Sequence, residues 1–129
     1  MTKQLSIVFG AVFVLVGMLG FVDNPVIGPA GIFETNQAHN MAHLLIGAVM
    51  LIAGFASERA AFLSLTIFGA VYLLLAIMGF AAIGTEGSTM LLGMVHVNGA
   101  DNWLHVALAV VLLAAGLARR RVSTVRTAH

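Results

Sequence analysis

Long apolar runs alternate with short polar stretches along the whole sequence. Four of these runs contain no Asp, Glu, Lys or Arg. They cover residues 5–22, 41–56, 60–84 and 103–118. A helix needs about 20 residues to cross the ~30 Å hydrocarbon core of a bilayer. The second and fourth runs reach that length when the polar turn before each is included. The pattern therefore predicts an all-α fold of four membrane-spanning helices, at about residues 5–22, 38–56, 60–84 and 101–118.

The composition agrees with a membrane environment. Hydrophobic residues make up 60% of the chain and charged residues 9%, whereas a soluble domain has about 45–50% and about 25%. The lipid bilayer is therefore the first predicted partner, and the net charge of +1 gives no indication of a nucleic-acid partner. The absence of cysteine excludes disulfides, thiolate metal sites and thiol redox chemistry.

The basic residues fall on one side of this four-helix topology. Lys3 precedes the first helix, Arg59 lies between the second and third, and the other four arginines follow the fourth. Cytoplasmic loops of membrane proteins carry an excess of Lys and Arg. We therefore expect a multi-pass protein of the plasma membrane with both termini in the cytoplasm. Its single domain, residues 1–129, would end in a basic cytoplasmic tail at residues 119–129.

The sequence also repeats itself at an offset of 62 residues. The common pattern, N-x-x-[HD]-N-x-x-H, opens the second and the fourth predicted helix. It pairs Asn36 with Asn98, His39 with Asp101, Asn40 with Asn102, and His43 with His105. A two-helix unit that occurs twice gives parallel halves related by an approximate two-fold axis along the membrane normal. The prediction is thus a bundle of two parallel two-helix repeats with both motifs on the outer side.

Small residues follow each motif on the same helical face, one and three turns on. They are Gly47 and Gly54 after the first motif, and Ala109 and Gly116 after the second. Small residues let membrane helices approach closely. These faces are predicted to point into the bundle, and the two halves are predicted to bring His43 and His105 towards each other.

A structural role is the first interpretation of the polar motifs. Asn is a favoured N-cap residue, so Asn36 or Asn40 and Asn98 or Asn102 would cap their helices. An acidic residue in the first turn, such as Asp101, suits the helix dipole. On this interpretation the histidines hold helices together near the outer surface, and Trp103 anchors the fourth helix at the membrane interface.

A metal site is the main alternative. His39 and His43 share a helical face, and so do Asp101 and His105. Three imidazoles and one carboxylate would suit Zn²⁺ or a similar divalent ion. Glu34 and His96 stand at equivalent places before the two motifs and are candidates for further ligands or supporting residues.

Haem is a third alternative. A b-type haem needs two histidines from facing helices, which His43 and His105 would supply. No basic residue on the predicted outer side is available to meet the haem propionates.

The two motifs also carry a family resemblance. The stretches "HNMAHLLIG" at residues 39–47 and "DNWLH" at residues 101–105 resemble H-N-x-x-H-L-x-x-G and D-N-x-L-H elements. These are typical of a bacterial, largely actinobacterial, family of small four-helix membrane proteins of unknown function. The resemblance covers essentially the whole chain. It implies the four-helix fold and the importance of the same polar positions, and it implies no activity.

No catalytic motif is evident, so enzymatic activity is not predicted. A transporter would need more helices or an oligomer, together with polar residues at mid-membrane depth. The sequence therefore favours a structural or accessory subunit of a larger membrane complex, with other membrane subunits or further copies of the chain as partners. Its outer polar cluster would hold a metal, a quinone or lipid headgroup, or a loop of a partner.

Overall fold

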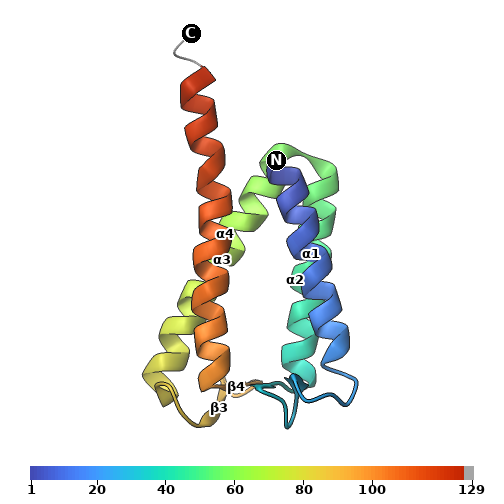
Figure 1. The fold of residues 1–129 in the computed structure, drawn as a ribbon, viewed down its shortest axis with the longest axis vertical. Helices are drawn as coiled ribbons and strands as arrows, with labels where there is room; N and C mark the ends of the chain where they lie inside the picture. Colours follow the sequence, from blue (N-terminus) through green and yellow to red (C-terminus); the bar gives the residue numbers. More distant parts are fainter. Residues whose placement is uncertain (127–129) are drawn as a thin grey trace.

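Four long helices form the body of the protein in the computed structural model (Figure 1). The structure describes residues 1–126, with side chains up to residue 118. The helices are α1 (Thr2–Leu19), α2 (Gln37–Ala56), α3 (Glu58–Ile83) and α4 (Gly99–Arg126). Each contains a stretch long and apolar enough to cross a membrane. Of the predicted basic tail, residues 127–129 lie outside the described residues, as do the side chains of residues 119–126.

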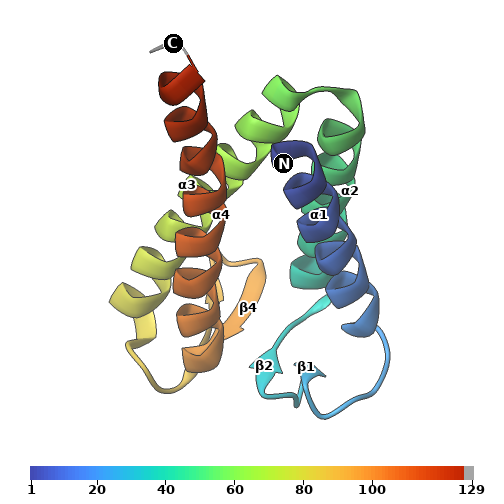
Figure 2. The ribbon, with the colours of Figure 1, turned by 45° about the horizontal axis from the view of Figure 1, so that its top comes forward.

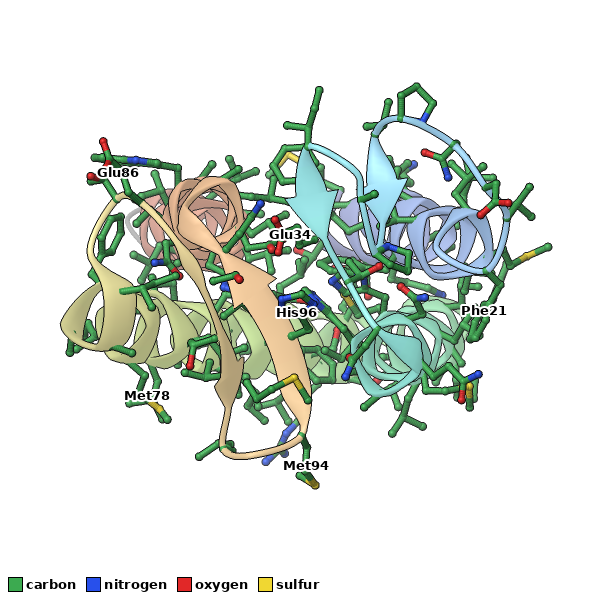
Figure 3. All side chains as sticks on the ribbon, turned by 90° about the horizontal axis from the view of Figure 1, so that it is seen from below. Phe21, Glu34, Met78, Glu86, Met94 and His96 are labelled. Carbon is green, nitrogen blue, oxygen red and sulfur yellow. The ribbon has the colours of Figure 1, made fainter. Side chains whose placement is uncertain are left out.

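Two small β-sheets cover one end of the bundle, which we call the strand end. Strands β1 (Ile27–Gly28) and β2 (Phe33–Glu34) pair in parallel, and β3 (Ser88–Leu91) and β4 (Val95–Asn98) form an antiparallel hairpin. Both sheets lie between the predicted helices, and the sequence pattern predicts no strand there. Figure 3 looks onto this end and shows Glu34 and His96 near its centre, whereas Glu86 and Met94 lie at the edges.

The helices pack as two consecutive pairs. The most extensive contacts join α1 to α2 and α3 to α4, and Figure 2 shows the two pairs side by side. Glycines permit the closest approach in the first pair. A Cβ added to Gly10 would lie 2.8 Å from the carbonyl oxygen of Gly47, and a Cβ added to Gly47 would lie 2.7 Å from that of Gly10. At this point the backbones of α1 and α2 are in direct contact.

The end opposite the strands contains the amino terminus and the short turn between α2 and α3. Ser57 caps α3 by accepting a hydrogen bond of 3.0 Å from the backbone N–H of Ala60. The amino group of Met1 lies 3.8 Å from a carboxylate oxygen of Glu58. Lys3 and Arg59 are therefore at the same end of the bundle.

The core lies between the two helix pairs. Its buried members come from all four helices: Phe13, Met50, Leu65, Tyr72, Ala109 and Leu112. The small-residue faces of α2 and α4 are buried as predicted. Towards the opposite end, the Ser6 hydroxyl donates to the Met50 carbonyl at 2.7 Å and lies 3.0 Å from the Ser64 hydroxyl. A small polar contact thus joins α1, α2 and α3 between the apolar core and the end opposite the strands.

Candidate functional site

The N-terminal ends of α2 and α4 are capped by the first asparagine of each motif. The Asn36 side chain accepts a hydrogen bond of 3.0 Å from the backbone N–H of His39. The Asn98 side chain accepts one of 3.0 Å from the N–H of Asp101. An N-cap side chain satisfies one of the backbone donors that a helix start leaves unpaired. The first asparagine of each motif therefore has a local structural role.

The same two asparagines also join the two halves of the molecule. The Asn36 amide donates to the Met94 carbonyl at 2.8 Å, and the Asn98 amide donates to the Ile32 carbonyl at 2.9 Å. Met94 follows Ile32 by 62 residues, as Asn98 follows Asn36. Each cap thus reaches the equivalent carbonyl of the other half, and we call this pair of hydrogen bonds the clasp.

His39 adds a third connection across the halves. Its Nδ1 lies 2.7 Å from the backbone carbonyl oxygen of His96. A carbonyl only accepts, so Nδ1 carries the proton and donates it. The Nε2 of His39 then has a free lone pair in the neutral ring. A histidine oriented by a carbonyl in this way is common beside metal sites and also in purely structural contacts.

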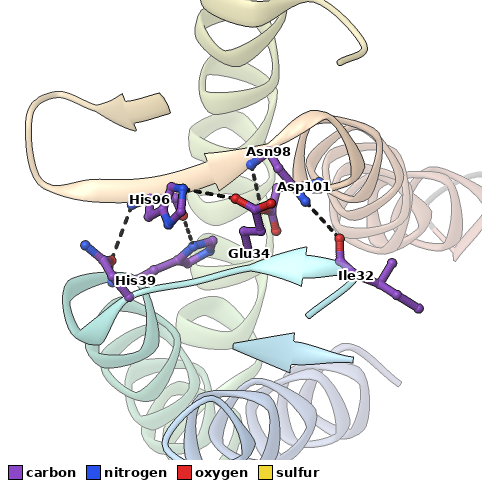
Figure 4. Close-up of polar contacts among 7 residues, drawn as sticks. Ile32, Glu34, His39, His96, Asn98 and Asp101 are labelled. Carbon is purple, nitrogen blue, oxygen red and sulfur yellow. Dashed lines mark hydrogen bonds and ion pairs between the residues drawn. The ribbon is translucent and has the colours of Figure 1, made fainter. Parts of the chain in front are cut away.

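Glu34 and His96, equivalent under the 62-residue offset, meet each other at the strand end. Their side chains approach to 3.1 Å between Glu34 Oε2 and His96 Nε2, and both are partly exposed. Figure 4 shows this contact beside His39, Asn98 and Asp101. The pair is ionic when His96 is protonated. The contact bridges β2 and β4. The two candidate metal ligands thus point towards each other.

Asp101 is occupied at its own helix end. Its Oδ2 accepts a hydrogen bond of 2.9 Å from the backbone N–H of Asn98, while Asn98 Oδ1 accepts from the N–H of Asp101. This reciprocal arrangement is a capping box with Asp at the third helical position. His39 thus bonds across the halves, whereas Asp101, at the equivalent position, bonds within its own half.

His43 and His105 lie one turn deeper and are buried. The ring of His39 contacts the rings of both, with centroids 4.6 Å from that of His43 and 6.1 Å from that of His105. Tyr72 contacts the His105 ring at 5.3 Å. Within residues 1–118, the Nδ1 atoms of both histidines are buried without a hydrogen-bond partner. They are two of the five buried side-chain atoms in this part of the chain that have no partner, the others being Thr35 Oγ1, Asn40 Oδ1 and Asn102 Oδ1.

The second asparagine of each motif packs against a glycine, Gly20 directly after the end of α1 or Gly79 within α3. A Cβ added to Gly20 would collide with the Asn40 side chain, and one added to Gly79 would collide with that of Asn102. The Asn102 amide also donates to the Gly84 carbonyl at 2.9 Å, at the end of α3. These asparagines therefore fix the strand end of each helix pair.

The structure brings the metal candidates together only in part. His39, His43 and His105 form one group of rings, whereas Asp101 lies in its capping box and Glu34 pairs with His96. Among the described residues, no group of three or more His, Asp or Glu side chains is arranged to hold a metal ion. The Nδ1 hydrogen bond of His39 and the unpartnered Nδ1 atoms are the features a metal site would use.

Two features of this region were not predicted from the sequence. They are the backbone carbonyls that accept the hydrogen bonds of the clasp, and the Thr35 side chain. The acceptors of the clasp are carbonyl groups, and no residue type marks them. The 62-residue offset does pair Ile32 with Met94, which was the available signal. Thr35 was not singled out either. It is buried with an unpartnered hydroxyl, and it lines a cavity of about 470 Å³ together with Asn36 and Asn40.

Trp103 lies on the surface of α4, next to the strand end. Its side chain is exposed and its ring packs edge-on against Phe80 of α3, with centroids 5.0 Å apart. Its role as an anchor at the membrane interface stays a prediction.

The comparisons with known proteins agree with a family of unknown function. No curated protein and no solved structure matches the chain. The family described as Domain of unknown function (DUF4383) matches residues 3–118. This match covers all four helices up to the end of the described side chains, as the sequence resemblance implied for an uncharacterised family. The chain therefore belongs to the DUF4383 family.

Proposed function

We propose that the protein is a structural or accessory subunit of a larger complex in the plasma membrane. The observation that supports this most is the use of the polar motifs. Asn36, Asn98 and His39 bond to backbone carbonyls of the opposite half, and Asp101 caps its own helix. A catalytic site presents its polar groups to a substrate. Here three of these four side chains join the two helix pairs, and the fourth caps its own helix.

The placement of the charges supports a cytoplasmic location for both termini. Lys3 and Arg59 lie at the end opposite the strands, where the Met1 amino group approaches Glu58. Figure 1 shows that α4 also runs to that end. Under the positive-inside rule this end faces the cytoplasm. The strand end and its polar motifs would then face outward.

One face of α2 is the best candidate for contact with a partner subunit or a second copy. Its apolar side chains Leu45, Ile52 and Phe55 are about 70% exposed, at the upper end of the values for large apolar residues in the helices. They are seven and three residues apart and so share a helical face. Lipid tails also cover apolar faces, so the proposal needs a test that separates lipid from protein.

Site-specific photocrosslinking makes that separation. A photoreactive phenylalanine at position 55 should give a single discrete protein adduct in native membranes, whereas the same group at Ile77, an exposed residue of α3, serves as the matched control. Mass spectrometry would identify the adduct as a second copy or another membrane protein. Equal crosslinking to lipid at both positions, without a protein adduct, would contradict the accessory role.

The metal-binding alternative is supported by the two unpartnered imidazoles. His43 and His105 are buried near His39, and metal coordination would satisfy their nitrogens. Asp101 would have to leave its capping box to join them. Metal analysis of gently purified protein tests this directly. About one Zn²⁺ per chain, lost in His43→Ala and His105→Ala, would support it, and metal below one tenth of the protein concentration would reject it. A Soret band in the same preparation would instead support haem.

A further inference from the structure

A cavity of about 470 Å³ opens at the strand end, between the end of α1, the loop that follows it and the start of α2. Half of the residues that line it have polar side chains. These are Asp23, Asn24, Thr35, Asn36, Gln37 and Asn40. Ligand pockets in proteins have volumes of about 300–1,000 Å³. The cavity is thus large enough for a small organic ligand.

Asn24 holds one wall of the cavity in place. Its amide group donates to the backbone carbonyls of Leu19, Val22 and Ile27, at 2.7–2.9 Å. Its Oδ1 accepts from the backbone N–H groups of Val26 and Ile27. These hydrogen bonds fix the loop after α1 without any contribution from a ligand. The cavity is therefore preformed, as small-molecule sites usually are.

The base of the cavity is polar. Thr35 and Asn40 line it, and their side chains are only 1% and 2% exposed. Within residues 1–118, Thr35 Oγ1 and Asn40 Oδ1 have no hydrogen-bond partner. Covering polar groups of this kind with hydrocarbon is unfavourable. The base therefore disfavours an acyl chain, and the accessible groups nearer the mouth decide which polar ligand binds.

Asp23 provides a negative charge at the mouth of the cavity, where its side chain is exposed. Lys3 and Arg59 are the only Lys and Arg residues within residues 1–118, and both lie at the end opposite the strands. An ionised carboxylate only accepts hydrogen bonds. The group that suits this position is therefore a positively charged donor such as a primary ammonium group.

The start of α2 provides the opposite charge. Gln37 is the first residue of this helix, and it lines the cavity with an exposed side chain. The first backbone N–H groups of a helix have no partner within the helix, and a helix start carries a partial positive charge. The Asn36 cap accepts from the N–H of His39 and not from that of Gln37. Phosphate groups bind to helix starts of this kind.

The two charges together select a zwitterion. A simple anion would face Asp23 without a basic side chain to offset the repulsion, and a simple cation would face the positive end of α2. A ligand with both charges satisfies both groups. Phe21 and Val22 border the cavity and are 50% and 62% exposed. This apolar border continues the exposed apolar side of α1, so a phospholipid headgroup has access from the bilayer.

We propose that this cavity binds a zwitterion that carries a primary ammonium group and a phosphate group. The ammonium group donates to the Asp23 carboxylate, and the phosphate accepts from the backbone N–H of Gln37. The headgroup of phosphatidylethanolamine and soluble phosphoethanolamine share this chemistry. The inference goes beyond the accessory role and does not depend on it. Figure 3 shows Phe21 at the edge of the strand end beside α1, and Glu86 at the other side of that end.

Two measurements on the full chain in dioleoylphosphatidylcholine nanodiscs test the proposal. Native mass spectrometry would count the phospholipids retained after addition of phosphatidylethanolamine or phosphatidylglycerol. Thermal unfolding would measure stabilisation by soluble phosphoethanolamine or phosphocholine. A preference of about tenfold for the primary ammonium compound over its trimethylated counterpart is expected, because the trimethylated nitrogen has no N–H to donate to Asp23.

The two measurements also separate the sources of the ligand. Selective retention of phosphatidylethanolamine would identify a lipid headgroup as the ligand, and selective stabilisation by phosphoethanolamine alone would identify a soluble one. The proposal is wrong if neither measurement distinguishes the primary ammonium group from the trimethylated one. A preference for phosphatidylglycerol, which has no ammonium group, would also overturn it.

Variants of exposed residues test the site without disturbing the core. Asp23→Asn removes the negative charge and should weaken binding about tenfold, as expected for a hydrogen bond between charged groups. Glu86→Gln is the matched control, because it removes an exposed carboxylate of the strand end that does not line the cavity. Its affinity should stay within about twofold of that of the wild type. Equal losses in the two variants would show a general effect of charge and reject the site.

A third variant fills the cavity. Ala30 lines it and is exposed, so Ala30→Trp places a large side chain in the space for the ligand while the helix packing stays intact. Selective binding should be lost, and the circular dichroism spectrum should match that of the wild type. Unchanged binding by the folded variant would mean that the ligand lies elsewhere, and the assignment of this cavity would be wrong.

Discussion

The α1–α2 pair and the α3–α4 pair carry similar polar motifs at their strand ends but are packed in different ways. In the first pair, Gly10 and Gly47 bring the two backbones into contact. In the second pair, Ala109 stands where Gly47 stands in the first. Gly116 there faces the Thr66 side chain, which would be 2.6 Å from an added Cβ. Backbone atoms thus limit how closely α1 and α2 approach each other. In the second pair, the close approach of α3 and α4 is limited by side chains that can move.

The two copies of the N-x-x-[HD]-N-x-x-H motif differ at one position. The clasp is reciprocal, with Asn36 bonded to Met94 and Asn98 to Ile32. The next motif position is His39 in one half and Asp101 in the other. His39 crosses to the other half, and Asp101 stays in its own. A pair of similar units can therefore keep its mutual contacts equivalent while one position takes different roles.

The largest expected effect follows from the packing difference. Gly10→Ala would place a methyl group against backbone atoms of α2, which cannot move without separating the helices. We expect it to lower the free energy of unfolding by about 3 kcal/mol, at the upper end for overpacking. Denaturation in mixed micelles, followed by circular dichroism, would measure this.

Gly116→Ala is the matched control for that prediction. Its methyl group meets the Thr66 hydroxyl, and rotation of that side chain would give up a hydrogen bond of 2.9 Å to the Phe62 carbonyl within the same helix. A loss of about 1 kcal/mol is expected. If both variants lose the same amount, the distinction between a backbone-limited and a side-chain-limited interface is wrong.

The clasp gives the next largest effect. Asn36→Ala removes the cap of α2 and the hydrogen bond to Met94, so a loss of about 2 kcal/mol is expected. Asn36→Asp keeps the accepting oxygen for the cap and removes only the donor of the clasp, so it should recover about half of the loss. Asn98→Ala should behave like Asn36→Ala. A loss confined to one of the two alanine variants would show that the clasp is not reciprocal in its energetics.

The smallest effect is expected where the motifs differ. His39→Leu removes the hydrogen bond to the His96 carbonyl and should cost about 1 kcal/mol. Asp101→Asn keeps an oxygen that accepts from the Asn98 N–H, so its effect should stay below about 0.5 kcal/mol. Thermal unfolding in detergent would compare the two. A larger loss for Asp101→Asn would indicate that the carboxylate charge has a role beyond the cap.

The helices and the polar positions were predictable from the sequence for a physical reason. A segment that crosses a bilayer must be apolar over its length and must satisfy its backbone internally, so composition alone indicates a helix. Polar residues in such segments are costly, and that cost singled out His39, His43, Asp101 and His105. The prediction that the small-residue faces point inward follows from the same reasoning and is confirmed by their burial.

The partners of those residues were decided only by the tertiary structure. Backbone carbonyls of Ile32, Met94 and His96 accept the connections between the halves, and a carbonyl is present at every residue, so no sequence pattern identifies the one that is used. The same holds for the Nδ1 atoms of His43 and His105, which the packing of the helices leaves buried without a partner. The sequence determined which side chains are chemically available near the strand end. The packing of the two helix pairs determined which of them have hydrogen-bond partners and which do not.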